Sequence, residues 1–353
     1  MSQSADMRTD HIVGGMFGLA DVGQGRGTTP PFLKGNAFFF VSARAAMRFL
    51  FRQRRPRKIW MPSYLCETML QALEGTGTEL EFFPVDYDLQ ITDREWIRRL
   101  DRRDIVVLIS YFGFAIPEDV CRAIRERGAL VLEDASQALL SGHVGRYADY
   151  VVFSPRKFLG VPDSGILINQ SDRPLGGAEG LIPPPKDWWL KAFTASLLRW
   201  EFDRHGGDRH WFALFRQVED SQPVGDFAAS ELSQMLLTHA FDYVEIAERR
   251  RDNYQFLLAH LKNVALYAHL PDDVVPLGFP IRTNQRNQLR QYLFGQKIFL
   301  PIHWDMPDVV PMDFVDSRRL TEAILTLICD QRYTERELAP MVDVVTRHLG
   351  RVG

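Results

Sequence analysis

Short apolar runs alternate with amphipathic stretches through the first half of the chain. The runs of strand length lie at Lys58–Met61, Leu80–Val85, Ile105–Ser110, Ala129–Glu133, Tyr150–Phe153 and Gly165–Ile168. Between the earlier runs the pattern predicts helices at Ala43–Arg54, Leu65–Leu73, Asp93–Leu100 and Pro117–Arg127. This alternation is typical of an α/β/α sandwich around a mostly parallel sheet. The loop between the last two strands is too short for a crossover helix, so at least one strand is expected to run antiparallel.

The rest of the pattern divides the chain into parts. We expect an N-terminal arm over residues 1–37, a large domain over 38–225 and a smaller C-terminal α/β domain over 226–353. The large domain includes a tryptophan-rich insert at about 183–217. Three roles remain open for this insert: it packs against a domain or subunit neighbour, it forms a lid over a substrate, or it binds a membrane surface. After it, Ser230–Leu261 is predicted to form one long amphipathic helix.

The composition narrows the classes of function. A length of 353 residues with 46% hydrophobic residues allows a large domain and a smaller one. The net charge of -3 gives no general electrostatic reason to bind nucleic acid. The three cysteines form no CxxC pair, so we expect no metal site and a cytoplasmic protein. The N-terminus lacks the apolar core of a signal peptide, and no run of about 18 apolar residues could span a membrane.

Lys157 stands in a short loop between the last two of the apolar strands. An ammonium is costly to bury beside a protein interior unless it is paired or loses its charge. A solvated turn that holds Arg156 and Lys157 would explain this loop by itself. The polar residues after the neighbouring strands favour a second interpretation, in which the lysine carries chemistry.

These polar residues follow two strands and open the first helix. Ser42 can cap that helix, and the free amides of Ala43 and Arg44 then form an anion site. Asp134 follows one buried strand, and Ser154 follows the next. Ligands collect at this edge of open α/β sheets. A helix cap or a salt bridge would also account for each residue taken alone.

Together the residues supply what a pyridoxal phosphate site requires. A lysine amine forms the Schiff base with the cofactor, and a carboxylate pairs with its pyridinium nitrogen, so that the ring can act as an electron sink. Backbone amides and a hydroxyl hold the phosphate, and small side chains leave room for the flat ring. The sequence therefore predicts pyridoxal 5'-phosphate as the cofactor, with Lys157 as its covalent partner.

Several segments occur in a characteristic order along the chain: SARAAM, MPSYLCET, ISYFG, VLEDASQALL and ADYVVFSPRKFLGVPDSGILI. In this order they resemble the DegT/StrS-type sugar aminotransferases, which are fold-type-I pyridoxal phosphate enzymes. The resemblance implies the fold-type-I architecture, with a smaller C-terminal α/β domain. Lys157 matches the Schiff-base lysine, Asp134 the partner of the pyridine nitrogen, and Gln137 the residue beside the ring oxygen. Cys66 and Ser136 match the residues over the two faces of the ring.

The resemblance assigns the phosphate cradle to Ser154 and to the amides of Ala43 and Arg44. Three departures from the family pattern concern this part of the site, one of which is Ala43, which replaces a glycine in the phosphate turn. Ser164 replaces the first glycine of the usual Gly-Gly pair. Asp226 stands near the place where many relatives carry an asparagine that reaches the neighbouring subunit's phosphate. A carboxylate would repel phosphate, so we do not expect Asp226 to make that contact.

The resemblance implies an aminotransferase that moves an amino group from a donor such as glutamate to a keto-sugar nucleotide. Lys157 would form the Schiff base and shuttle the proton during the transfer. Since the family assembles as homodimers with sites at the subunit interface, we also expect a homodimer. His303 and Trp304 are candidates for lining the substrate cleft, with a packing role as the alternative.

Two other functions remain open. The departures and the tryptophan-rich insert leave room for a pyridoxal phosphate enzyme that acts on a non-sugar substrate or catalyses a lyase or decarboxylase reaction. A catalytically silent scaffold that retains the fold is the third hypothesis. The sequence contains no P-loop, GxSxG or HExxH motif, and GQGRG near the N-terminus is not a dinucleotide-binding GxGxxG.

Overall fold

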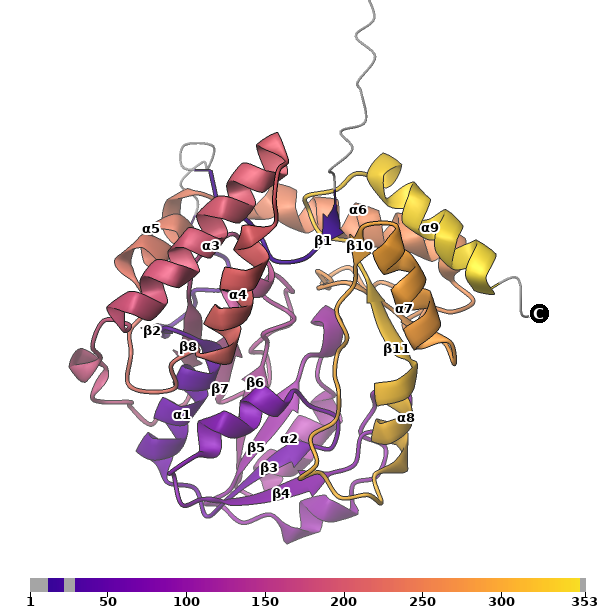
Figure 1. Ribbon diagram of the computed structural model, residues 1–353. Coiled ribbons are helices and arrows are strands. Elements are labelled where there is room, and N and C mark those ends of the chain that lie inside the picture. The colour runs from indigo at the N-terminus through magenta and orange to yellow at the C-terminus, as the bar shows by residue number, and fades with distance from the viewer. Residues whose placement is uncertain (1–11, 22–28, 350–353) are drawn as a thin grey trace, which may run out of the picture.

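The computed structural model describes residues 12–21 and 29–349, and Figure 1 shows their arrangement. Within these residues the chain forms a 7-stranded mixed sheet in the order β2-β8-β7-β6-β5-β3-β4. The strands are, in that order, Asn36–Phe40, Gly165–Asn169, Tyr150–Phe153, Leu130–Asp134, Ile105–Ile109, Lys58–Pro62 and Glu79–Phe83. Strands β3 to β7 run parallel, whereas β8 is antiparallel to both of its neighbours. The antiparallel strand expected from the short loop is therefore β8.

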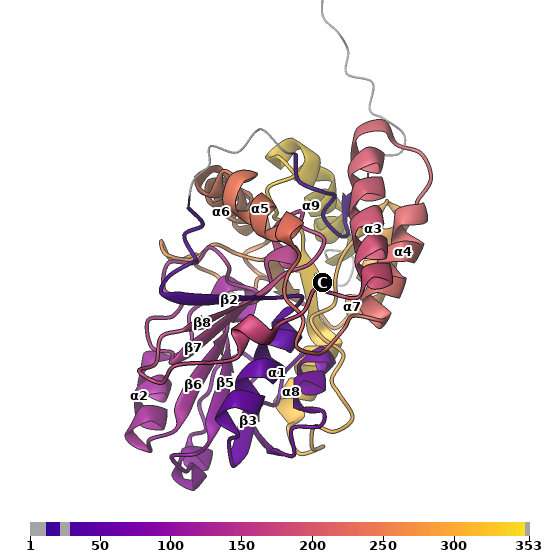
Figure 2. The same cartoon turned by 90° about the vertical axis from the view of Figure 1, so that its left-hand side faces the viewer.

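Helices cover both faces of this sheet. Figure 2 shows α1 (Ala43–Arg54) and α2 (Glu118–Glu126) on opposite sides of it. Strand β5 is buried along its whole length, because side chains from both layers cover it. The large part of the molecule is thus an α/β/α sandwich around a mostly parallel sheet, and the predicted fold class is confirmed.

The C-terminal part of the chain has its own core around a two-stranded antiparallel sheet, β9 with β11. Its elements are α6 (Tyr243–Leu261), β9 (Phe279–Arg282), α7 (Arg286–Gly295), β10 (Ile298–Phe299), α8 (Val315–Ala323), β11 (Ile324–Leu327) and α9 (Glu335–Leu349). The N-terminal arm adds β1 (Val13–Gly14), which pairs in parallel with β10. The division into an arm, a large domain and a small domain that begins at 226 stays a proposal.

The tryptophan-rich insert forms a helical hairpin of α3 (Lys186–His205) and α4 (His210–Asp220). Trp188 and Trp211 are buried, and the indole N–H of Trp188 donates to the carbonyl of Val218 at 3.0 Å. These contacts hold the two helices of the hairpin together. No helix in the described part of the chain combines the length and the apolar character that a membrane crossing needs.

Some elements differ from those that the periodicity predicts. Strand β2 begins within the segment expected to be an irregular arm. The segment Ser230–Leu261 forms two helices, α5 (Glu231–His239) and α6, because the Asp242 side chain caps a new helix start. Single 3-10 segments at Glu67–Leu73 and Glu95–Arg99 replace two predicted α-helices. The two helix types share closely similar apolar spacing, which is why the pattern did not separate them.

Glu133 is a buried carboxyl on the face of β6 opposite Asp134, since side chains alternate along a strand. It accepts hydrogen bonds from the Ser110 hydroxyl at 2.6 Å and from the Gly145 amide at 2.8 Å. Burial nevertheless raises the pKa of Glu133 to about 7, and the neighbouring charge of Asp134 acts in the same direction. The folded protein therefore keeps a proton that the unfolded chain releases near pH 4.5.

We predict that Glu133 makes the protein less stable as the pH rises. Between pH 4.5 and about 7 the folded state binds the extra proton, so the free energy of unfolding falls by about 3 kcal/mol and then levels off. The side chain in Glu133→Gln cannot titrate, so the free energy of unfolding of this variant should fall less over the same pH range, by that amount. Urea unfolding at a series of pH values measures both slopes, and equal slopes would contradict the prediction.

Candidate active site

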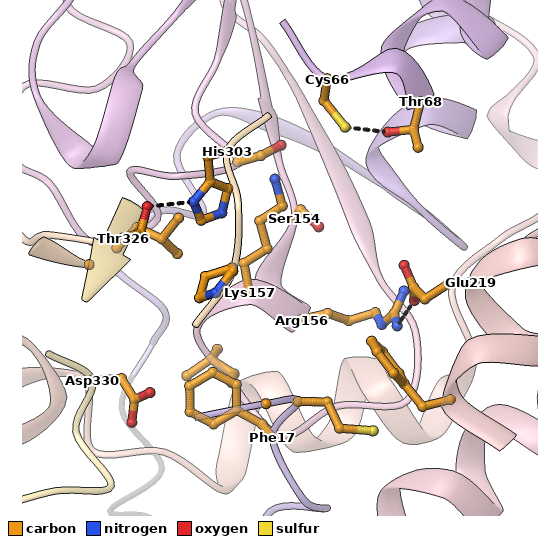
Figure 3. A pocket seen from close by; sticks show the side chains of 18 of the residues that line it. Phe17, Cys66, Thr68, Ser154, Arg156, Lys157, Glu219, His303, Thr326 and Asp330 are labelled. Carbon is orange, nitrogen blue, oxygen red and sulfur yellow. Dashed lines mark hydrogen bonds and ion pairs between the residues drawn. The ribbon is translucent and has the colours of Figure 1, made fainter. Parts of the chain in front are cut away.

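A cavity of about 670 Å³ lies between the C-terminal edge of the large sheet, the α3–α4 hairpin and the C-terminal part. Open α/β sheets bind ligands at this edge. Most residues predicted for the site line the cavity: Ala43, Arg44, Cys66, Asp134, Ser136, Ser154, Lys157, His303 and Trp304. Figure 3 shows the Lys157 side chain reaching into it beside His303.

Asp134 and Lys157 approach the cavity from the ends of two neighbouring parallel strands, β6 and β7. Asp134 is the last residue of β6, and its carboxylate accepts a hydrogen bond from the Ser136 amide at 2.9 Å. Lys157 ends the single turn Pro155–Lys157 that follows β7, and its amide donates to the Ser154 carbonyl at 3.1 Å. The sheet therefore brings a fixed carboxylate and a primary amine to one cavity.

The start of α1 forms another wall of the cavity. Ser42 caps the helix, and its hydroxyl accepts from the Ala45 amide at 3.2 Å. Gly165 of β8 packs against this turn so closely that a Cβ atom there would lie 2.0 Å from the Ser42 carbonyl carbon. Among the described residues, the amides of Ala43 and Arg44 have no hydrogen-bond partner. Together with the helix dipole, these amides make this corner suitable for an anion.

Ser164 occupies a backbone conformation that favours glycine, with φ at 142°. It stands where the resemblance placed a glycine, so the substitution leaves the backbone strained. Such strain costs on the order of 1–3 kcal/mol and is concentrated at functional sites. Its side chain is fully buried in the cavity wall, and its hydroxyl has no partner within the described ranges.

Two residues that the resemblance introduced do not line the cavity. Gln137 is buried beside Phe112, whose amide donates to its side-chain oxygen at 2.6 Å, while its side-chain nitrogen has no partner in the part of the chain described. Asp226 forms an ion pair with Arg52 at 2.7 Å, and both side chains are about half exposed. The role of Gln137 beside the ring stays a prediction.

His303 and Trp304 both line the cavity, and their role toward a substrate stays a prediction. The Nδ1 atom of His303 lies 2.8 Å from the Thr326 hydroxyl. Burial lowers the pKa of His303 to about 3, because the surrounding protein disfavours the charged ring, and the charge of the nearby Lys157 acts in the same direction. His303 is therefore a neutral hydrogen-bonding group at physiological pH.

Several residues of the cavity wall had no recognisable pattern in the sequence. The N-terminal arm contributes Met16 and Phe17, and the hairpin contributes Phe215 and Glu219. Figure 3 shows Glu219 paired with Arg156, the residue that precedes the cavity lysine. The sequence pattern around Arg156 is also that of a solvated turn, and Glu219 belongs to no motif.

Solved structures share this architecture. Helicobacter pylori PseC, an aminotransferase involved in the biosynthesis of pseudoaminic acid, matches 90% of this chain and 87% of its own, with a TM-score of 0.66 at 15% sequence identity. A DegT DnrJ EryC1 StrS aminotransferase from Brucella abortus matches 89% and 86%, with a TM-score of 0.62 at 15% identity. DesI in the presence of its TDP-sugar product matches 88% and 79%, with a TM-score of 0.62 at 16% identity.

No protein-family model and no curated protein matches the sequence significantly. The likeness to solved structures therefore rests on the fold. At this level the resemblance inferred from the sequence motifs is confirmed, because the chain has the architecture of the DegT/StrS-type sugar aminotransferases over about nine-tenths of its length.

We predict that His303 remains neutral throughout the range in which the protein is stable. With a pKa of about 3, its ring should show no titration between pH 5 and 9. Proton NMR of the imidazole signals measures this, and a difference spectrum against His303→Gln identifies the resonance. The urea-unfolded protein is the control, since its histidines titrate near pH 6.5. A folded-state midpoint above 5 would contradict the prediction.

Proposed function

We propose that the protein is a pyridoxal-phosphate-dependent aminotransferase that links its cofactor to Lys157. One observation carries the proposal: Lys157 and Asp134 line the same cavity as the free amides at the start of α1. A catalytically silent scaffold would not need an amine, a carboxylate and an anion-binding helix start in one cavity. The shared fold with sugar aminotransferases supports the same conclusion.

The residues of the cavity fit pyridoxal phosphate. The volume of about 670 Å³ lies within the range of small-molecule sites. Phosphate would be held by the amides of Ala43 and Arg44 and by the Ser154 hydroxyl. Cys66 and Ser136 are small enough to face a flat ring, and both line the cavity.

The cofactor, when bound, supplies an aldehyde that links to amines and a ring that accepts an electron pair. The protein supplies the groups that hold and protonate it. Asp134 would keep a proton on the ring nitrogen, because an ionised carboxylate stabilises the positive charge there. Lys157 would hold the cofactor through its amine. Once the amine of the donor has replaced it in that bond, the freed Lys157 amine would carry the proton to and from the carbon that bears the amino group. His303, neutral and held by Thr326, can orient the substrate by hydrogen bonding.

We further propose a keto-sugar nucleotide as the acceptor, with an amino donor such as glutamate and a cytoplasmic location. The fold is that of sugar aminotransferases, and DesI was solved in the presence of its TDP-sugar product. A non-sugar acceptor, or a lyase or decarboxylase reaction, is the second candidate. It is favoured by one feature, the aromatic side chains in the cavity lining, which are those of Phe212, Phe215, Phe294 and Phe299.

Lys157→Ala tests the covalent link. The variant should still bind the cofactor, because the phosphate and ring contacts remain, but turnover should fall about 10²- to 10⁴-fold with the loss of the proton shuttle. Borohydride reduction followed by peptide mapping should label Lys157 in the unmutated protein. Label on another lysine would overturn the site, and a protein that takes up no cofactor would overturn the function.

Asp134→Asn should separate ring electronics from attachment. Borohydride should still fix the cofactor to Lys157, since the amine is intact. Turnover should fall about 10- to 150-fold, because a charged hydrogen bond to the ring nitrogen is lost. Comparison of labelling yield with kcat measures the two effects. A variant that keeps full kcat would exclude Asp134 from this role.

The proposal includes a homodimer with the cofactor sites near its interface. The outer face of α3 exposes Leu190 and Leu197, which are 43% and 39% accessible and lie two turns apart on one face. Leu190→Glu combined with Leu197→Glu should weaken dimerisation by at least about tenfold in sedimentation velocity. Val244→Glu, at a 65% exposed site on α6, is the control. An unmutated protein that is monomeric at micromolar concentration would contradict the dimer.

A further inference from the structure

Arg156 and Glu219 form an ion pair inside the cavity, as Figure 3 shows. Arg156 lies in the turn that carries Lys157, and Glu219 lies in the last turn of α4. Their side chains are 17% and 37% exposed, so the pair is only partly shielded from water. The pair ties the end of the hairpin to the loop that carries the proposed nucleophile.

A second guanidinium, that of Arg44 at the start of α1, lines the same cavity, where the charge of Glu219 acts to raise its pKa. Arg44 donates to the side-chain oxygen of Gln71 at 2.5 Å, and no carboxylate of the described residues lies within ion-pair distance of it. Burial lowers the pKa of Arg44, and the charge of Arg156 adds to this, against the opposing charge of Glu219. Arg44 is therefore a cation in the cavity wall without an acidic partner in direct contact.

Glu219 is an anion held among cations. Burial acts to raise the pKa of its carboxyl, but the charges of Arg156, Arg44 and Lys157 outweigh burial and lower it. One carboxylate does not balance the three cations around it. The start of α1, with its free amides, adds further positive potential at this corner.

We propose that Arg44 and Arg156 form a binding site for an oxyanion, and that the Glu219 carboxylate occupies this site until the ligand displaces it. Guanidinium groups bind carboxylate and phosphate oxygens through the same N–H donors. The carboxylate of Glu219 therefore stands in for the oxygens of the ligand. When an oxyanion takes its place, α4 loses its contact with the lysine loop and the hairpin is released on that side.

The oxyanion can come from two sources, and naming the first of them rests on the proposed function. One source is the phosphate of the cofactor, held jointly with the α1 amides and Ser154. The other is a carboxylate of the amino donor. Pyridoxal lacks the phosphate, and glutarate carries only carboxylates, so these two compounds separate the sources.

The test compares the affinity of inorganic phosphate for the protein and its variants by titration calorimetry. Glu219→Gln removes the competing charge and should bind phosphate about tenfold more tightly. Arg156→Gln removes a charged donor and should bind about 10- to 150-fold more weakly. Asp220→Asn is the matched control, because it makes the same charge change one residue further along α4, outside the cavity. Its affinity should stay within about twofold of the unmutated protein.

The signs of the two effects decide the proposal. If the ion pair only stabilised the fold, loss of Glu219 and loss of Arg156 would have the same effect, and neither substitution would tighten phosphate binding. Opposite signs support the displaced carboxylate, whereas equal signs overturn it. A Glu219→Gln protein that behaves like Asp220→Asn overturns it as well. Thermal melting shows whether each variant is folded. If Arg156→Gln does not fold, Arg44→Gln takes its place, and the same weakening of phosphate binding is expected for it.

Hydrogen exchange of α4 supplies a second readout that does not depend on activity. Phosphate should increase exchange in residues 210–220 of the unmutated protein, since it releases Glu219. In Glu219→Gln this exchange should already be high and phosphate should not raise it further. Unchanged exchange in the unmutated protein at saturating phosphate would overturn the displacement.

The same variants identify the source of the oxyanion. If Glu219→Gln tightens pyridoxal phosphate but not pyridoxal, the site takes the cofactor phosphate. If it tightens glutarate in the cofactor-loaded protein instead, the site takes a substrate carboxylate, and either result supports the proposal. Failure of the proposed function has a different signature. In that case borohydride would leave no cofactor label on Lys157, while the variants would still change phosphate affinity in opposite directions.

Discussion

The close contact between the start of α1 and strand β8 is the constraint on which the cavity depends. Gly165 permits it, because any side chain would collide with the backbone of Ser42 and Ala43. Strand β8 also pairs with β7, and the chain between these two strands carries Lys157. One backbone contact therefore fixes the separation between the anion corner and the lysine loop. The strained φ of Ser164, the residue before Gly165, arises where the chain makes this approach.

The part of the site that lies at strand ends could be predicted from the sequence. Parallel strands end at one edge of a sheet, so the positions of Asp134 and Lys157 after consecutive apolar runs were enough to place them together. The predicted long helix at 230–261 shows the limit of periodicity, because the amphipathic pattern continues across the break. The capping residue Asp242 was the available signal, since aspartate is favoured at helix starts and disfavoured within helices.

The remaining walls could not be predicted because tertiary contacts alone place them. Arg156 and Glu219 are separated by 63 positions, and neither residue belongs to a motif that requires the other. The tryptophans of the hairpin indicated that it packs against something, but not which of its faces does so. The structure resolves this in part: Trp188 and Trp211 are buried within the molecule, whereas Leu190 and Leu197 remain exposed on α3.

The N-terminal arm shows why such walls leave so little trace in a sequence. Buried Arg199 of the hairpin donates to the Gly14 carbonyl at 3.1 Å, and Arg332 of the C-terminal part donates to the Gly15 carbonyl at 3.1 Å. These bonds use the backbone of the arm, so they constrain its path and not its side chains. At Gly14 the demand on the sequence is steric, since a Cβ atom there would lie 2.3 Å from the Phe299 carbonyl oxygen. A segment that supplies backbone carbonyls to arginines of two other parts of the chain can therefore close a cavity without carrying a recognisable motif.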